Sequence, residues 1–358
     1  MKRTVFLVLL ACCLLLCGCN NFLDGSYASL TPHTAQQVQT SQGMVTISSA
    51  RESVAFLTDM TENGQEYAVF ALDPAYATEI LEEMDVSILY VTKNTPIAAF
   101  TVEKISYEVG NMAGVQAVGI TVSYNTNRMA IETMHHAEDS ASARDLITDA
   151  LARCKDRIVL YVSDYSYMDF EKHIREFVVQ RPDAVMEAPQ VSIRFYPNAG
   201  AVQVMDVRFS YQNQLDSLQA MQNYVQPVFA AAEMNVRGED AEFAKFSRLY
   251  AFLMERNDYR IGVSNTPAYS LLRHGVGDSM AFARVYATMC HRADLECYVV
   301  SGTRNGEPWT WNIIRDGDRY YHLDLLRADE LDGFTLWSDE EMQGYVWDYS
   351  SYPACEAL

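Results

Sequence analysis

Basic residues are scarce in this chain of 358 residues: 27 lysines and arginines stand against 47 aspartates and glutamates, giving a formal net charge of −20. Nucleic acids and anionic lipid surfaces are bound mainly through positive charge, so this balance argues against a nucleic-acid partner. With 49% hydrophobic and 21% charged residues, the composition is typical of a globular protein and excludes a wholly disordered, collagen-like or polytopic membrane chain. The length suits two domains or one elaborated domain.

The apolar run near the N-terminus, residues 5–16, is shorter than the roughly 20 residues that a permanent membrane-spanning helix needs. Lys2 and Arg3 precede this run and small residues follow it, which is the order of a secretory signal. The run ends in Leu-Cys-Gly-Cys at 16–19, which resembles the lipobox of bacterial lipoproteins. In that family, the cysteine after the small residue receives diacylglycerol and becomes the mature N-terminus.

The lipobox resemblance implies a signal peptide at 1–18, lipidation of Cys19 and anchoring to a bacterial cell membrane on its extracytoplasmic side. Two acyl chains anchor a protein stably where one chain is marginal. Residues 19–50 are rich in Ser, Thr, Gln and Gly and are predicted to form a flexible tether. The alternatives are a second lipobox that ends at Cys12, with only residues 4–11 as its apolar run, an ordinary cleaved signal, and an uncleaved anchor.

Cysteines are few after Cys19, and the four that remain are Cys154, Cys290, Cys297 and Cys355. Outside the cytoplasm an even number permits disulfides, and four can pair in three ways. Their spacing does not resemble a zinc site, and buried free thiols are the default interpretation, because Cys290 falls on an apolar helical face. His135 and His136 are adjacent in the sequence, and adjacent residues on a strand would point to opposite faces. We therefore expect no metal ion and no other cofactor.

The hydrophobic periodicity changes near residue 213 and divides the rest of the chain into two predicted domains, 51–212 and 213–358. The first is predicted to be an α+β domain with helices at 73–84, 140–154 and 167–179 and strands at 86–91, 101–108, 115–124, 157–162, 191–196 and 202–211. Pro-Asn-Ala-Gly at 197–200 is predicted to join the last two strands as a hairpin, because Asn and Gly tolerate positive φ. No motif in this domain carries chemistry.

The second domain begins with helical spacing and ends with strands. Helices are predicted at 214–236, 239–256, 266–274 and 278–293, and strands at 297–303, 309–315 and 319–323. Asp316 and Gly317 are predicted to form the hairpin turn between the last two strands. The expected fold is therefore a set of helices packed on a short antiparallel sheet.

The sequence of 268–281, Ala-Tyr-Ser-Leu-Leu-Arg-His-Gly-Val-Gly-Asp-Ser-Met-Ala, resembles the core of the bacterial transglutaminase-like superfamily. Trp-Thr-Trp-Asn at 309–312 and Tyr-Tyr-His-Leu-Asp at 320–324 are similar to its His-Ala-Trp-Asn and Trp-Tyr-His-Val-Asp strands. Phe334 and residues 338–342 resemble the family's ending. The resemblance covers about 214–345, and it implies a papain-like fold.

The same resemblance implies that the catalytic machinery is missing. Active members use a cysteine nucleophile, a histidine base and an aspartate that orients the base. The matching positions are Gly277, which has no side chain, Trp309, which cannot accept a proton, and Asp324. Because triad members act as a unit, losing the nucleophile and the base should remove nearly all covalent catalysis.

Nearby residues offer weak surrogates. Ser279 lies two residues beyond Gly277, and a helix turns about 200° over two residues, so Ser279 faces elsewhere and is better explained as a helix N-terminal residue. His322 and His274 are the available surrogate bases. The alternative function is therefore an active acyl transferase or peptidase on surface or cell-wall peptides. It requires Ser279, one of these histidines and Asp324 to lie within hydrogen-bond reach of one another.

The predicted function is a lipid-anchored pseudoenzyme that binds a partner or serves as a scaffold at the cell surface. Its expected partners are the membrane, through the lipid on Cys19, and a surface protein, a peptide or a cell-wall glycan. Trp309 and Trp311 share one face of a strand and are ligand-binding candidates, although the favoured interpretation is that Trp309 fills the vacated cavity. A third hypothesis makes residues 51–212 the interaction module.

Aromatic residues are dense near the C-terminus. They form either a packed cap, which is the favoured interpretation, or a partner surface. They are Trp337, Tyr345, Trp347, Tyr349 and Tyr352.

Overall fold

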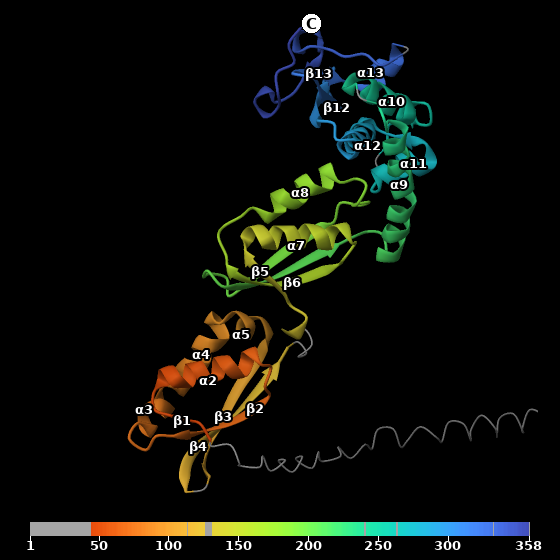
Figure 1. Ribbon diagram of the computed structural model, residues 1–358. Helices are drawn as coiled ribbons and strands as arrows, with labels where there is room; N and C mark the ends of the chain where they lie inside the picture. Colours follow the sequence, from red (N-terminus) through yellow and green to blue (C-terminus); the bar gives the residue numbers. More distant parts are fainter. Residues whose placement is uncertain are drawn as a thin grey trace, which may run out of the picture.

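The computed structural model describes residues 44–357, apart from 113, 126–130, 240, 263 and 332. The predicted signal peptide and Cys19 therefore lie outside the described residues. Helices and strands are mixed along the chain, which confirms the α+β class, and Figure 1 shows them as three successive units, each built on its own sheet. Among the described helices, none is long and apolar enough to cross a membrane.

The first unit is a four-stranded sheet packed against four helices. Its strands lie in the order β1-β2-β4-β3, with β1 and β2 parallel and the other pairs antiparallel. They are β1 (Thr46–Ile47), β2 (Tyr67–Leu72), β3 (Val102–Met112) and β4 (Val115–Tyr124), and the helices are α2 (Ala50–Glu62), α3 (Ala77–Glu82), α4 (Met84–Asn94) and α5 (Pro96–Thr101). Because β1 pairs with β2, Thr46 and Ile47 belong to this unit, although the tether is predicted to extend to residue 50.

The strand predicted at 86–91 is wrong, because these residues belong to helix α4. Met84, Ser87 and Val91 are its buried residues, a spacing of three and four that matches one face of a helix. A short apolar run of this kind reads equally well as a strand or as part of a helix.

The second unit is another four-stranded sheet, in the order β5-β6-β8-β7. Its strands are β5 (His135–Asp139), β6 (Arg157–Asp164), β7 (Gln190–Tyr196) and β8 (Gln203–Ser210), and its helices are α7 (Ser140–Ala152) and α8 (Phe170–Gln180). The hairpin of β7 and β8 is confirmed, with Tyr196 opposite Val204. Ile147, Leu160 and Val207 are buried in a core of its own.

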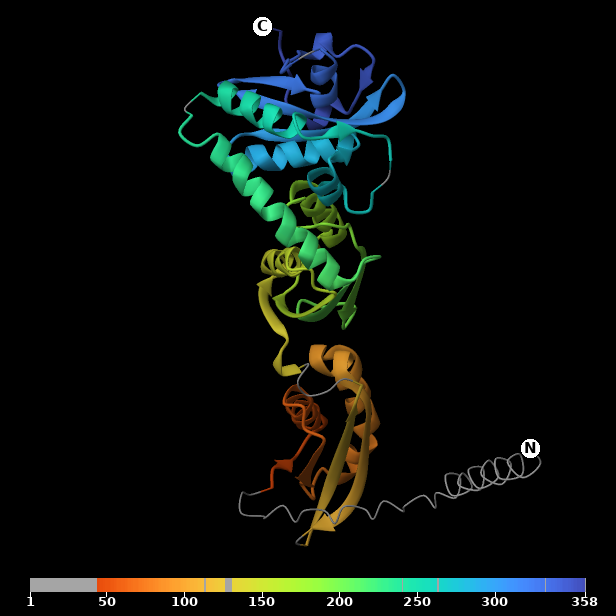
Figure 2. The same ribbon diagram turned by 90° about the vertical axis from the view of Figure 1, so that its right-hand side faces the viewer.

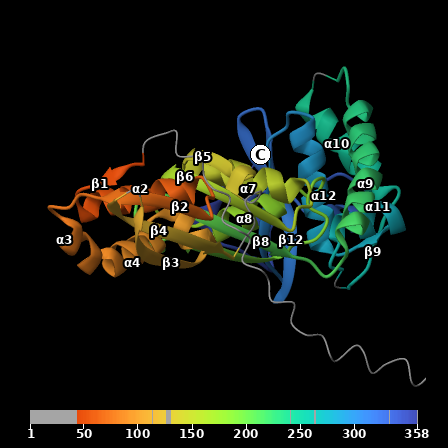
Figure 3. The same cartoon turned by 90° about the horizontal axis from the view of Figure 1, so that it is seen from below.

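The single α+β domain expected at 51–212 is thus two units with separate sheets and separate cores. Hydrophobic periodicity predicted most of the strands, but it holds no information on which strands pair. A small cluster joins the two units, where Phe100 of α5 contacts the Tyr196 ring with centroids 5.4 Å apart and Val204 is fully buried. Seen from below, the second unit lies between the first and the third (Figure 3).

The third unit packs helices against an antiparallel sheet in the order β13-β12-β11-β14. Its helices are α9 (Leu215–Asn235), α10 (Glu242–Met254), α11 (Pro267–His274), α12 (Ser279–Arg292) and α13 (Leu325–Glu330), and its strands are β11 (Cys297–Arg304), β12 (Glu307–Asp316), β13 (Arg319–Leu323) and β14 (Tyr345–Val346). Two short parallel strands, β9 (Asp258–Tyr259) and β10 (Val276–Gly277), flank the start of α12. The helices and strands predicted for this region are confirmed.

Helix α12 is the centre of the third unit's core, because it packs against both the other helices and the sheet. Phe282, Tyr286 and Met289 on this helix are each at most 1% exposed. Helix α9 runs from the second unit to the third (Figure 2). Gln222 on α9 donates to the carbonyls of Ala152 and Ala184, which fixes the two units to each other.

The C-terminal aromatic segment packs as a cap. Trp337, Tyr345 and Trp347 are buried, whereas Tyr349 is 60% exposed and lies against the Trp347 ring. The four cysteines of the described chain are all buried and free, as the default interpretation expected.

Candidate functional site

Asp324 is the centre of a saturated hydrogen-bond network. It follows β13 and caps α13, where its Oδ1 accepts from the backbone N–H groups of Leu326 and Arg327 at 3.1 and 3.3 Å. Its Oδ2 accepts from the Trp309 indole N–H at 2.8 Å and from the Tyr345 hydroxyl at 2.6 Å. The residue is only 1% exposed. Four donors therefore satisfy a buried carboxylate.

Arg304 supplies the positive charge beside this carboxylate. Its Nη1 lies 3.9 Å from Asp324 Oδ2, and its guanidinium lies 5.2 Å from the centroid of the Trp309 ring. Burial, together with the Asp324 charge, raises the pKa of Tyr345. The Tyr345 hydroxyl therefore stays protonated and keeps donating to Asp324.

Trp309 occupies the space beside Asp324. The side chain is half-buried on β12, with the Tyr259 ring 5.5 Å away and the Arg304 guanidinium over its own ring. In a nucleophile–base–acid triad, the aspartate accepts an N–H from the base, and here the indole donates such a bond. An indole has no lone pair that takes a proton, so this pair cannot act as base and orienting acid.

Gly277 is half-buried, lines a small pocket and leaves little space for a side chain. It pairs with Tyr259 across β10 and β9. A Cβ built at Gly277 would lie 3.0 Å from the Ala281 Cβ and 3.1 Å from the Leu271 Cδ1, which is too tight unless these atoms shift. Since the Tyr259 ring also contacts Trp309, one tyrosine joins the two degenerate positions.

The surrogate residues do not form a catalytic set. Ser279, the first residue of α12, accepts from the Thr310 backbone N–H at 3.3 Å and is 7% exposed. His274 is exposed, and its ring lies against Tyr269. Within the described chain, Ser279, His274, His322 and Asp324 form no hydrogen bonds with one another.

His322 is fixed elsewhere, in the interior. It is fully buried, with Nδ1 2.9 Å from the Trp311 indole N–H and Nε2 2.8 Å from Asp339 Oδ1. Because the indole can only donate, Nδ1 accepts and Nε2 carries the proton that is donated to Asp339. Burial lowers the pKa of His322, and the hydrogen bond to Asp339 opposes this shift only in part. The ring is therefore a neutral member of the core.

Trp311 is a core residue, which corrects the hypothesis that it binds a ligand. It is 1% exposed and surrounded by His322, Tyr345 and Trp347, with ring centroids 5.2 to 6.2 Å away. The alternation of Trp309 and Trp311 did predict that they share a face of the strand. It did not predict that this face at Trp311 is covered by the C-terminal cap.

Three residues that sequence reasoning did not connect could hold a metal ion. Nitrogen, oxygen and sulfur atoms of His322, Asp339 and Cys355 lie within 4.8 Å of one another. His322 Nε2 carries a proton, and burial, together with Asp339, raises the pKa of the Cys355 thiol to about 12. Both protons must leave before a metal ion binds, so the cluster as described is a hydrogen-bond network. No local motif signals it, because the three residues lie far apart in the sequence.

One region of the chain holds the three positions that match the catalytic triad, Gly277, Trp309 and Asp324. The same region has the papain-like order of helices and strands. Residues 230–325 match the transglutaminase-like superfamily. The family resemblance seen in the sequence is thereby confirmed, and this transglutaminase-like region includes Gly277, Trp309 and Asp324. No curated protein matches the chain in sequence.

Three solved structures are distantly similar. A structure assigned as a cysteine protease from Cytophaga hutchinsonii is 12% identical, with a TM-score of 0.27, and the match covers 41% of this chain and 65% of that chain. A structure described as a TGase is 8% identical, with a TM-score of 0.27 and coverages of 61% and 63%. A structure assigned as a protease from Parabacteroides distasonis is 8% identical, with a TM-score of 0.24 and coverages of 62% and 35%. The chain spans less than two thirds of the length of each.

Proposed function

We propose that this protein is a bacterial lipoprotein, held on the extracytoplasmic side of the cell membrane through Cys19, whose transglutaminase-like region has lost catalysis. In this proposal the region serves as a binding or scaffold module for a surface protein, a peptide or a cell-wall glycan. The lipid brings the acidic chain to the membrane, and the folded units present their surfaces to partners there.

The observation that carries the proposal is the 2.8 Å hydrogen bond from the Trp309 indole N–H to Asp324 Oδ2. At this position the family resemblance expects a histidine that takes a proton from the nucleophile. The indole keeps the hydrogen bond to the acid but has no basic nitrogen. The crowding of Gly277 by Ala281 and Leu271 supports the same conclusion, since a nucleophilic side chain there would need these neighbours to shift.

The test is an amine-incorporation and peptide-hydrolysis assay on the chain from Asn20 to Leu358, which retains every described residue. We expect no turnover above a blank without protein, while an active transglutaminase in the same assay serves as the positive control. Turnover that Ser279→Ala or His322→Asn abolishes would instead establish the alternative, an enzyme with an atypical site.

The anchor is tested separately by labelling cells with a radioactive fatty acid. Cys19→Ser is expected to abolish incorporation of the label and to release the protein from the membrane fraction, while Cys12→Ser leaves both unchanged. Loss of label in Cys12→Ser alone would move the lipid to the second lipobox. Label in neither the wild type nor the variants would contradict lipidation.

A further inference from the structure

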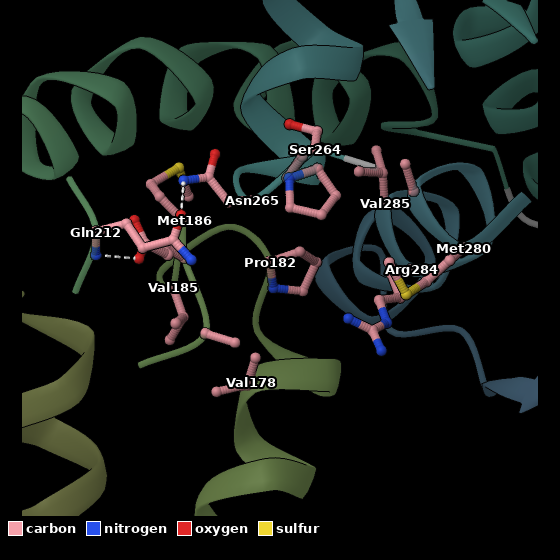
Figure 4. A pocket seen from close by; sticks show the side chains of 15 residues that line it. Val178, Pro182, Val185, Met186, Gln212, Ser264, Asn265, Met280, Arg284 and Val285 are labelled. Atoms are coloured by element: carbon pink, nitrogen blue, oxygen red, sulfur yellow. Dashed lines mark hydrogen bonds between the residues drawn. The ribbon is translucent and has the colours of Figure 1, made fainter. Parts of the chain in front are cut away.

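A pocket lies where the second and third units meet, apart from the degenerate site. The segment that follows α8 contributes Pro182 and Val185 to its wall, and α12 contributes Met280 and Arg284 (Figure 4). Its volume is about 200 Å³, smaller than pockets for drug-sized ligands, which limits the occupant to a small group. None of the three matched triad positions lines it, so a ligand can bind here whether or not the protein is an enzyme.

Arg284 is an unpaired cation on the wall of this pocket. Its Nε is buried and has no hydrogen-bond partner, and no carboxylate of the described chain forms an ion pair with its guanidinium. Arg292, two turns further along the same helix, shows the ordinary arrangement: its guanidinium lies 3.7 Å from Asp183 and 3.5 Å from Glu233. Arg284 is half-buried, and a partly desolvated cation without a counterion is unfavourable, so its guanidinium can accept an anion that the described chain does not supply.

Two acids of this region, Asp278 and Glu187, form hydrogen bonds with other groups. Asp278 caps α12, where its Oδ1 accepts from the Ala281 backbone N–H at 2.9 Å. Glu187, which also lines the pocket, accepts from the Asn213 backbone N–H at 3.1 Å and from its side-chain Nδ2 at 2.7 Å. Burial lowers the pKa of Arg284 and the charge of Asp278 opposes this shift only in part, although an arginine still stays protonated near neutral pH.

The rest of the pocket is largely apolar. Val178, Val185 and Val285 line it together with Met280, and Figure 4 shows the Arg284 guanidinium at one side of the pocket with Gln212 at the other. A ligand that fits needs one negative charge at one end and a compact apolar body. A dianion such as phosphate fits less well, because a single guanidinium would face two negative charges beside Glu187 and Asp278.

We propose that this pocket binds the free carboxylate end of a peptide, with the carboxylate on the Arg284 guanidinium and an apolar last side chain between Val185 and Met280. The planar guanidinium offers two parallel N–H donors to a carboxylate, which gives direction as well as charge. The pocket thus gives the chain a ligand site that its sequence motifs do not indicate.

The test compares N-acetylleucine with N-acetylleucinamide, which differs in the charged end alone, by NMR titration of the chain from Asn20. We expect the amide to bind at least tenfold more weakly than the acid. Arg284→Met should weaken acid binding at least tenfold and leave the amide unchanged, and Arg284→Lys should retain part of the acid's affinity. Arg237→Met is the matched control for net charge, because Arg237 is exposed and lines none of the described pockets.

Equal binding of the acid and the amide, absence of saturable binding, or an Arg284→Met variant that binds the acid as well as the wild type would each overturn the proposal. Inorganic phosphate binding as tightly as N-acetylleucine would overturn the carboxylate assignment. If Arg284→Met fails to fold, the comparison of acid and amide on the wild type and on Arg284→Lys still decides the question.

Discussion

At the scale of single residues, Asp324 explains why the degenerate site is ordered. Its two oxygens accept four hydrogen bonds, from an indole, a phenol and two backbone N–H groups. A buried carboxylate without such donors would be costly, so each donor stabilises the fold. Trp309 therefore has a structural role that does not require a ligand.

Substitution of Trp309 separates a structural role from a ligand platform. Trp309→Ala removes the ring and one donor to a buried carboxylate, and we expect the free energy of unfolding to fall by about 3 kcal/mol. Trp309→Phe keeps most of the ring and loses the hydrogen bond, with an expected loss of about 1–2 kcal/mol. Urea unfolding measures both. Unchanged stability in Trp309→Ala would favour the platform interpretation.

His322 predicts a pH dependence of stability. Its pKa is lowered by burial in the folded state, so the unfolded chain binds the proton at higher pH, near the ordinary value of 6.5. Stability is therefore fullest above about pH 6.5 and falls as the pH decreases below it, towards the lower folded pKa. His322→Asn should reduce this slope between about pH 7 and pH 5, whereas His274→Asn, at an exposed histidine, should not. Equal slopes in the wild type and both variants would contradict the assignment.

At the scale of elements, the pattern of hydrophobic residues predicted α9 to α12 and the hairpin of β12 and β13, although α12 is buried on nearly all sides rather than on one face. The prediction was wrong at α4, because a short apolar run there fits a strand as well as a helix. The spacing of 309–312 and 320–324 placed Trp309 and Asp324 in the candidate site. It could not supply Tyr345 or Tyr259, because both come from other segments and touch the site only after folding.

Gly302 on β11 lies where β14 and the Trp311 ring of β12 approach the backbone closely. A Cβ there would collide with the Val346 carbonyl oxygen of β14 and lie 2.9 Å from the Trp311 ring. Gly302→Ala should therefore lower the free energy of unfolding by about 1–3 kcal/mol in a denaturant titration. Gly110→Ala in β3 is the matched control, because nothing lies within 4 Å of its Cβ. Similar losses in both variants would indicate a general effect of glycine in strands.

At the scale of the whole molecule, the three units are not equivalent. The first unit contacts the second through a small apolar cluster. The second and third units are joined by the hydrogen bonds of Gln222 and by the ion pair of Arg292 with Asp183. The pocket at Arg284 exists only where these two units meet, which is why neither sequence region alone predicted it. One hypothesis from the sequence treats residues 51–212 as one interaction module, but they form two units. The second of these units shares the proposed ligand pocket with the third unit.

The most direct test of the disarmed site is to restore its lost groups and measure amine incorporation beside the wild type. The re-armed chain carries Gly277→Cys and Trp309→His, with Ala281→Gly to give the new Cβ room, and Trp309→His alone is the control. We predict turnover in the re-armed chain and none in the wild type or the control, because only the re-armed chain has both nucleophile and base. Turnover by the wild type would contradict the account.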